Sequence, residues 1–107
     1  IGQHFPDTDP QYAGADSLQL LARTVAVVHE AGWLVANVDV TVMAERPRLA
    51  EASPAMREKL AGVLGLQIDA VSVKATRGEG LGPEGRGEAI TVHAVALLQP
   101  VTPAANP

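Results

Sequence analysis

Cysteine is absent from the sequence, and aromatic residues are scarce: there is one Phe, one Trp and one Tyr. Without cysteine the chain has neither a disulfide framework nor a thiolate metal site. Positive charge is also in the minority, because eight Lys and Arg stand against twelve Asp and Glu and give a net charge of −4. This balance argues against nonspecific nucleic-acid binding. No apolar run approaches the roughly 18 residues of a membrane-spanning helix. We therefore expect neither a nucleic acid nor a membrane as partner.

Small and aliphatic residues dominate what remains. Of the 107 residues, 47% are hydrophobic, so the core must be built from Val, Leu and Ala. A chain of this length forms one domain with a real but small core. It begins at Ile1 and Gly2, with no initiator Met and no signal peptide. We expect a processed or truncated chain.

Two helices are predicted from apolar spacing and end signals. The first begins after Asp16 or Ser17, either of which can cap it, and Gly32 ends it. Its apolar stripe is Leu18, Leu21, Val25 and Val28. The second runs from Ser53, as its cap, through Pro54 at the first helical position to Gly65. Its apolar stripe is Met56, Leu60, Val63 and Leu64.

Three strands are predicted, over residues 34–45, 69–75 and 89–98. In the first, Val38, Val40 and Val42 alternate with polar residues, which predicts one apolar face. The last has apolar residues on both faces, which predicts that both are covered. The order of elements predicts an α/β (α+β) domain over residues 1–99, a mixed sheet with helices packed on it, and a flexible tail over 100–107. Because three strands are few for this much apolar surface, we expect self-association or further strands before Ile1.

A glycine-rich segment, Lys74 to Ile90, joins the last two strands. Its glycines are Gly78, Gly80, Gly82, Gly85 and Gly87. One interpretation is a plain hairpin with a long flexible loop. The other is a site for phosphates and a divalent cation, because backbone N–H groups and Arg suit anionic oxygens and Glu79 suits a metal.

Two other loops have alternative interpretations. Residues 5–9 form either a surface turn or a binding loop, and His4 with Asp7 and Asp9 is a candidate metal-ligand set. Residues 45–51 form either a charged turn or an anion contact at a strand end, where α/β folds commonly bind ligands. The strand residue Asp39 is expected to be hydrogen-bonded or solvated. His29 and His93 are expected to be structural.

The order of several motifs indicates a family. IG, FPDTDP and GADS are followed by NVDVT, by a strand ending in AERPR, and by a glycine loop that closes with GRGE and AVALL. FPDTDP and GRGE are specific when they occur together in this order and separation. From Ile1 to about Leu98 the chain resembles 2-C-methyl-D-erythritol 2,4-cyclodiphosphate synthases of the non-mevalonate isoprenoid pathway.

The resemblance implies an activity and its partners. These lyases convert 4-diphosphocytidyl-2-C-methyl-D-erythritol 2-phosphate to the cyclodiphosphate and release CMP. They are homotrimers with active sites between subunits, and some hold an isoprenoid diphosphate on the trimer axis. Their cofactors are zinc, or another divalent transition metal, and magnesium or manganese. The resemblance also implies a cytoplasmic bacterial protein.

The resemblance assigns roles to residues of this chain. The segment for the methylerythritol phosphate end of the substrate comprises Ile1, Gly2, Phe5, Pro6, Asp7, Thr8 and Asp9. The cytosine pocket comprises Ala44, Pro47, Arg48, Leu49 and Ala50, with Ala75 and Thr76 as its other wall. The catalytic positions beside the diphosphate are Thr76 and Arg77. Glu79 takes the place of the second metal's carboxylate, and Arg86 and Glu88 line the trimer axis.

Three departures from the family pattern leave two hypotheses. The family's zinc ligands lie upstream of Ile1, Arg77 replaces a phosphate-contacting Thr, and Pro83 replaces a Phe. The first hypothesis is a trimeric cyclodiphosphate synthase whose zinc-binding segment is absent from this chain. The second is a catalytically inactive trimeric module that binds a cytidine nucleotide or isoprenoid diphosphate. A plain α/β domain with a chance glycine loop is the third interpretation.

Overall fold

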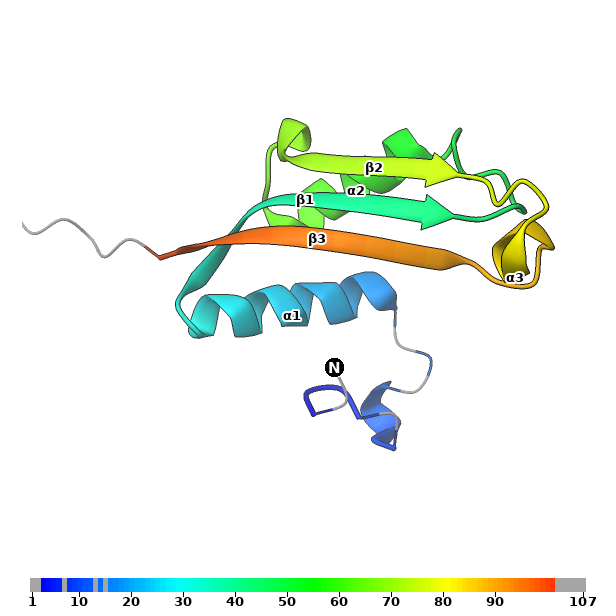
Figure 1. Cartoon of the computed structure of the whole chain (residues 1–107). Helices are drawn as coiled ribbons and strands as arrows, with labels where there is room; N and C mark the ends of the chain where they lie inside the picture. The colour runs from blue at the N-terminus through cyan, green and yellow to red at the C-terminus, as the bar shows by residue number, and fades with distance from the viewer. Residues whose placement is uncertain (1–2, 7, 13, 15, 102–107) are drawn as a thin grey trace, which may run out of the picture.

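A three-stranded sheet forms the centre of the fold (Figure 1). The computed structural model describes residues 3–6, 8–12, 14 and 16–101. The strands are β1 (Trp33–Met43), β2 (Val71–Thr76) and β3 (Thr91–Pro100), in the order β2-β1-β3. β1 pairs in parallel with β2 and antiparallel with β3. With helices α1 (Ser17–Glu30) and α2 (Ser53–Leu64) packed against it, the predicted mixed α/β (α+β) sheet is confirmed.

Alternation along β1 decides which face of the sheet meets the helices. Val40 and Val42 are 9% and 7% exposed, whereas Asp39, the residue before Val40, is exposed on the other face. Val40 pairs with residues of both neighbouring strands, and so the apolar row continues across the sheet. The core on this face comprises Val25 of α1, Ala61 and Leu64 of α2, and Val71 of β2.

Local hydrogen bonds define where the helices begin and end. The Asp16 carboxylate accepts a bond from the Leu18 N–H at 2.8 Å, as predicted for a cap of α1. Gly65, at φ +68°, ends α2 in the left-handed region that glycine favours. The predicted cap of α2 is wrong by one residue. Ala52 is the N-cap, because the Ser53 hydroxyl is already inside the helix and donates to the Ala50 carbonyl at 2.7 Å.

The predicted hairpin of the last two strands is wrong. β1 lies between β2 and β3, so the segment that joins them crosses the end of β1 (Figure 1). It must span two strand spacings, about 10 Å. It contains a short helix, α3 (Gly82–Gly85), that the sequence pattern did not indicate. Short 3-10 turns lie at η1 (Pro10–Tyr12) and η2 (Ile68–Ala70), just before β2.

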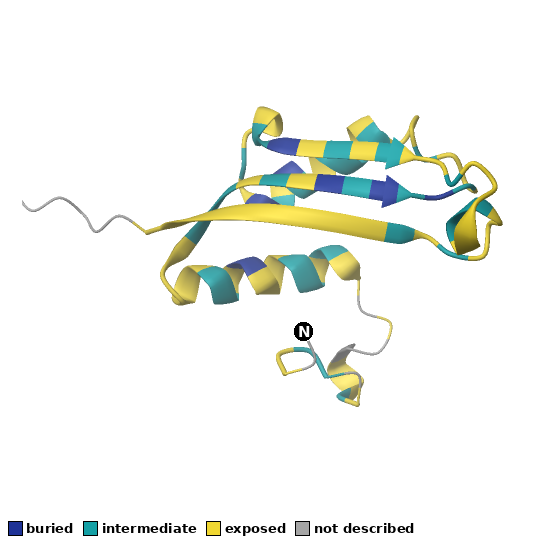
Figure 2. Cartoon of the chain, viewed as in Figure 1, coloured by how far each residue is buried: buried dark blue, intermediate teal, exposed yellow. Residues whose placement is uncertain are grey.

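The prediction that both faces of β3 are covered does not hold within this chain. Figure 2 shows β3 exposed along most of its length, while β1 and β2 hold buried positions. Val92 is 57% exposed on one face and Val95 is 70% exposed on the other. The physical reason is that α1 packs mainly on α2 and β1. A cavity of about 380 Å³ is left between the helices and the β1–β3 side of the sheet.

The end of β3 overlaps the start of the predicted tail. Pro100, placed in the predicted tail, pairs with Trp33 at the end of β3, and the rest of that tail from residue 102 lies outside the described residues.

None of the helices in the described part of the chain has the length and apolar character to span a membrane.

The Asp16 cap yields a stability prediction. Asp16→Ala removes the acceptor for the Leu18 N–H, so the free energy of unfolding should fall by about 1 kcal/mol in urea denaturation. Asp16→Asn is the matched control: it keeps a capping oxygen and should stay close to the parent protein. Equal losses in the two variants would contradict the capping role.

Candidate functional site

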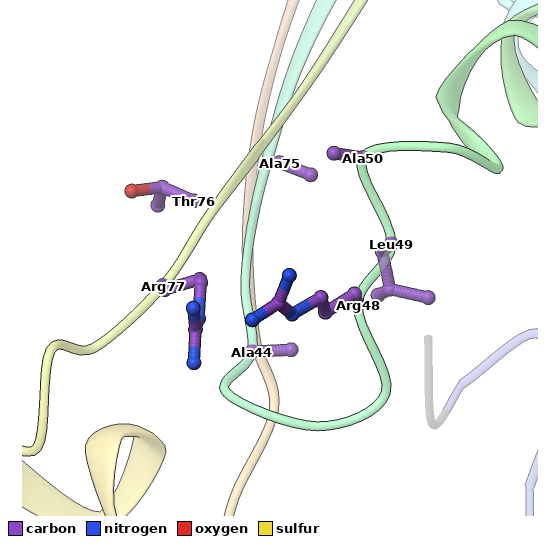
Figure 3. Close-up of a pocket in the computed structure, with 7 residues that line it drawn as sticks. All are labelled: Ala44, Arg48, Leu49, Ala50, Ala75, Thr76 and Arg77. Carbon is purple, nitrogen blue, oxygen red and sulfur yellow. The ribbon is translucent and has the colours of Figure 1, made fainter.

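A pocket of about 180 Å³ opens where β1 and β2 end (Figure 3). Its lining residues come from the end of β1, the following loop and the end of β2: Ala44, Arg48, Leu49, Ala50, Ala75, Thr76 and Arg77. The Ala44 N–H donates to the Thr76 carbonyl at 3.0 Å, which extends the parallel ladder to the floor of the pocket. The pocket therefore lies at the carboxyl ends of two adjacent parallel strands, a common ligand position in α/β folds.

Small side chains and two cations give the pocket its character. Ala44, Ala50 and Ala75 carry only methyl side chains, so the pocket wall leaves room for a flat ligand. In Figure 3 Arg48 extends from the β1–α2 loop toward the side on which Arg77 lies. Two guanidinium groups beside small side chains suit a planar base that carries phosphate.

An ion pair fixes Arg77 at this end of the sheet. Its Nη2 lies 2.5 Å from Oε1 of Glu45, the second residue after the end of β1. The Glu45 side chain is 16% exposed and that of Arg77 is 44% exposed. The pair therefore joins the segments that follow β1 and β2, and it holds one pocket cation against a largely buried carboxylate.

The opposite face of the sheet carries a separate ion pair. Lys74 Nζ lies 2.9 Å from Asp39 Oδ1, and the bond from Lys74 lowers the pKa of Asp39 below 3.8. The expectation that Asp39 is hydrogen-bonded on the strand is confirmed. Lys74 belongs to β2 and does not line the pocket.

Close backbone contacts fold the glycine loop tightly. A Cβ on Gly78 would lie 2.5 Å from the Gly85 Cα, and a Cβ on Gly85 would lie 2.6 Å from the carbonyl carbon of Gly80. No side chain fits at either contact. Between them Glu79 has φ +53°, so its exposed carboxylate stands at a sharp turn. The loop is thus a defined structure that projects Glu79, which differs from the plain flexible hairpin.

One hydrogen bond ties the glycine loop to β3, and an ion pair lies just before the strand. The Thr91 hydroxyl donates to Glu84 Oε1 at 2.6 Å, and this bond is the main cause that lowers the pKa of Glu84 below 4.5. The Arg86 Nε donates to Glu88 Oε1 at 3.0 Å, with both side chains more than half exposed. Arg86 therefore lies outside the pocket, next to the start of β3.

The N-terminal loop forms a turn and packs against α1. The Asp9 N–H donates to the Pro6 carbonyl at 3.1 Å, and the Asp9 carboxylate accepts two bonds from Gln11. The side-chain bond from Gln11 is the largest cause that lowers the pKa of Asp9. Phe5 lines a small cavity with His4 and α1. The geometry is that of a surface turn, and its substrate role stays a prediction.

The structure unites part of the predicted site. Six residues of the predicted cytosine pocket line one cavity together with Arg77: Ala44, Arg48, Leu49, Ala50, Ala75 and Thr76. Other predicted site residues do not line it: Phe5, Pro6, Thr8, Asp9, Pro47, Glu79 and Arg86. Ile1, Gly2 and Asp7 lie outside the described residues.

The described residues contain no ready-made cluster of metal ligands. No group of three His, Asp or Glu side chains converges there to hold a metal ion. The set of His4, Asp7 and Asp9 includes Asp7, which lies outside the described residues. Glu79 fits magnesium or manganese as a single carboxylate, because these ions are often held by one or two carboxylates together with substrate phosphates.

Comparison with known proteins identifies the family. A model of the YgbB family matches residues 1–99. The chain belongs to the YgbB family. Its YgbB relatives include the 2-C-methyl-D-erythritol 2,4-cyclodiphosphate synthases of Trichlorobacter lovleyi, 50% identical over 100 residues, and Thermosynechococcus vestitus, 54% identical over 99 residues. The resemblance indicated by the motifs is confirmed.

The matches cover a larger share of this chain than of its YgbB relatives. They cover 94% and 92% of this chain but 64% and 62% of the two relatives, so the chain spans less than two thirds of their length. Among solved structures, the bifunctional IspDF from Campylobacter jejuni has a TM-score of 0.87 and 37% identity, over 94% of this chain and 27% of that one. A CDP complex of Plasmodium falciparum IspF has a TM-score of 0.79 and 26% identity, over 95% and 60%.

Sequence reasoning did not single out Glu45. The parallel register pairs Met43 with Thr76, so Glu45, two residues after Met43, and Arg77, one residue after Thr76, leave the same end of the sheet and form an ion pair. Opposite charges just beyond two neighbouring parallel strands were the available signal. Using it required the pairing of β1 with β2, which the periodicity of single strands does not reveal.

The glycine contacts yield a second prediction. Gly78→Ala forces a Cβ into the Gly85 backbone, so the free energy of unfolding should fall by about 2–3 kcal/mol. Gly62→Ala is the matched control: it lies in α2 with open space around it and should change stability by at most about 1 kcal/mol, toward greater stability. Thermal and urea unfolding measure both. Similar values for the two variants would contradict the tight loop.

The Glu84–Thr91 bond yields a prediction for pH. Because the folded pKa of Glu84 lies below its ordinary value of 4.5, the bond stabilises the fold above pH 4.5 and loses its effect as pH falls through the folded pKa. Thr91→Val should therefore unfold more easily than the parent at pH 7, and this difference should narrow progressively below pH 4.5. Urea titrations at several pH values measure it, and a pH-independent difference would contradict the assignment.

Proposed function

We propose that the protein is a 2-C-methyl-D-erythritol 2,4-cyclodiphosphate synthase, a lyase of isoprenoid biosynthesis. It would convert 4-diphosphocytidyl-2-C-methyl-D-erythritol 2-phosphate to the cyclodiphosphate and release CMP. The observation that carries the proposal is the pocket at the ends of β1 and β2, which gathers six residues predicted for the cytosine site. Cyclodiphosphate synthases of 50–55% identity over most of this chain support it.

The pocket suits the cytidine diphosphate part of this substrate. The pocket wall formed by Ala44 and Ala50 would hold the base, while Arg48 and Arg77 would offer positive charge to phosphates. The CDP complex of the Plasmodium falciparum relative supports this class of ligand. The attraction for the ligand's phosphates must come from side chains in the pocket, because the chain as a whole carries a net charge of −4.

The proposed reaction is an intramolecular phosphoryl transfer. The 2-phosphate oxygen attacks the β-phosphorus, a bond to phosphorus forms, and the bond to the CMP oxygen breaks. No protein nucleophile takes part, so this chain contributes positioning and charge neutralisation. The Thr76 hydroxyl would donate a hydrogen bond to a diphosphate oxygen. The Arg77 guanidinium would balance the negative charge that develops on the diphosphate. The N-terminal segment, Ile1 to Asp9, would hold the methylerythritol phosphate end.

Two kinds of metal belong to the proposal. Glu79 would hold magnesium or manganese beside the diphosphate, where the ion supplies charge neutralisation. The second is zinc, or another divalent transition metal, for which the described residues offer no ligand group. We assign the zinc ligands to residues outside this chain.

We extend the proposal to a homotrimer in the bacterial cytoplasm. Apolar side chains exposed on both faces of β3 support association between copies. In this assembly, Arg86 and Glu88 would line the trimer axis, a candidate site for an isoprenoid diphosphate. The bacterial relatives support the location.

Release of CMP from the authentic substrate tests the function directly. The full-length protein, purified with zinc and magnesium, should release CMP and form the cyclodiphosphate, both measured by chromatography and phosphorus NMR. Binding of CDP without CMP release would favour the inactive binding module, which Arg77 and Pro83 in place of the usual residues support. Absence of both binding and release would overturn the function.

Glu79 yields a mutational prediction. Glu79→Gln removes the carboxylate without changing side-chain length, so magnesium-dependent turnover should fall by at least about 100-fold while the oligomeric mass and unfolding midpoint stay unchanged. Glu58→Gln, on the exposed side of α2, is the matched control and should keep full activity. Undiminished turnover of Glu79→Gln would remove Glu79 from the metal site.

A further inference from the structure

We propose that Glu45 is a positioning residue that holds the Arg77 guanidinium at the pocket for the diphosphate of a cytidine nucleotide. The inference rests on the proposed function, and it assigns to Glu45 a role in how strongly the phosphate part of the ligand binds. Arg77 contacts the ligand in this arrangement, and Glu45 acts only through Arg77.

The first support is the rigidity of the anchor. Glu45 directly follows Ala44, whose N–H donates to the Thr76 carbonyl at 3.0 Å, and Arg77 directly follows Thr76. Both partners of the ion pair therefore leave the sheet next to a backbone hydrogen bond. Their separation of 2.5 Å fixes the guanidinium relative to the same ladder that forms the pocket floor.

The second support is the environment of the Glu45 carboxylate. Its Oε2 is buried and has no hydrogen-bond partner within the described ranges, while Oε1 binds Arg77. A buried acceptor without a partner is unfavourable for folding. A side chain present only to fill this space would be apolar. The ion pair with Arg77 is thus the interaction that accounts for a carboxylate here.

The third support is the number of donors left on Arg77. A guanidinium has five N–H donors, and the contact with Glu45 uses Nη2. Arg77 also lines the pocket, so its remaining donors can meet phosphate oxygens. Arginine has many rotamers, and holding one of them before binding reduces the entropy lost on binding.

Arg48 provides an internal comparison. It lines the same pocket and is exposed, and across the described part of the chain no carboxylate lies within ion-pair distance of it. One pocket cation is held by a carboxylate and the other is not. Glu45 should therefore couple energetically to Arg77 and not to Arg48.

The effect of removing Glu45 has two opposing parts. Its negative charge repels a diphosphate, so loss of charge alone would strengthen binding. Its grip on Arg77 favours binding, so loss of the grip would weaken it. Glu45→Gln removes the charge but keeps an oxygen that can accept from Arg77, whereas Glu45→Ala removes both. The two substitutions separate charge from positioning.

Isothermal titration calorimetry with CDP and with cytidine tests the proposal on the purified protein in magnesium buffer. We expect Arg77→Ala to weaken CDP binding about tenfold and to leave cytidine binding unchanged. Glu45→Ala should weaken CDP binding about fivefold, and Glu45→Gln should stay within about twofold of the parent. The double variant Glu45→Ala with Arg77→Ala should bind CDP no more weakly than Arg77→Ala alone.

Controls make each outcome decisive. In the double variant Arg48→Ala with Glu45→Ala, the loss of CDP binding free energy should equal the sum of the losses in the two single variants, since those residues do not touch. If Glu45→Ala does not fold, Glu45→Ser, equally too short to reach Arg77, replaces it. CDP binding in Glu45→Ala at or above the parent level would overturn the positioning role and leave the proposed function standing. A parent protein that binds neither CDP nor cytidine would overturn the proposed function itself.

Discussion

Backbone pairing along both edges of β1 is the constraint on which the other elements depend. Its parallel pairing with β2 requires a crossover, and α2 provides it on the face where Val40 and Val42 point. Its antiparallel pairing with β3 sends the glycine loop across the end of β1. The β1–α2 loop and the start of the glycine loop therefore leave the same end of the sheet. The pocket is the space between them, and it follows from strand order rather than from any single side chain.

Much of the fold could be predicted because its local signals act over a few residues. Alternation over Val38 to Val42 identified the buried face of β1, and Asp16 and Gly65 marked helix ends through capping and left-handed geometry. Strand order could not be obtained this way, since periodicity shows which side of a strand is apolar and not which strand lies beside it. The Ser53 cap was misplaced by one residue, because Ser53 is the first residue of α2 and its hydroxyl donates to the Ala50 carbonyl.

The sequence predicted part of the candidate site and missed the part that depends on strand pairing. Motif order named the alanines and Arg48 that meet in the pocket, and the structure gathers them although they come from segments some 25 residues apart. Glu45 was not named, because its partner lies on another strand and only the register brings the two charges together. Arg48 and Arg77 lie at one end of the sheet of a chain whose net charge is −4, so the proposed attraction for a diphosphate depends on these two side chains and not on the overall charge.

The exposure of β3 has a thermodynamic consequence. A strand that leaves Val92 and Val95 in solvent on opposite faces contributes little hydrophobic free energy to a lone chain. If that surface is buried only between copies, folding and association become one equilibrium, and stability is a property of the solution as well as of the molecule. The midpoint of thermal unfolding would then rise with protein concentration, and dilution alone would act on this protein as a denaturant.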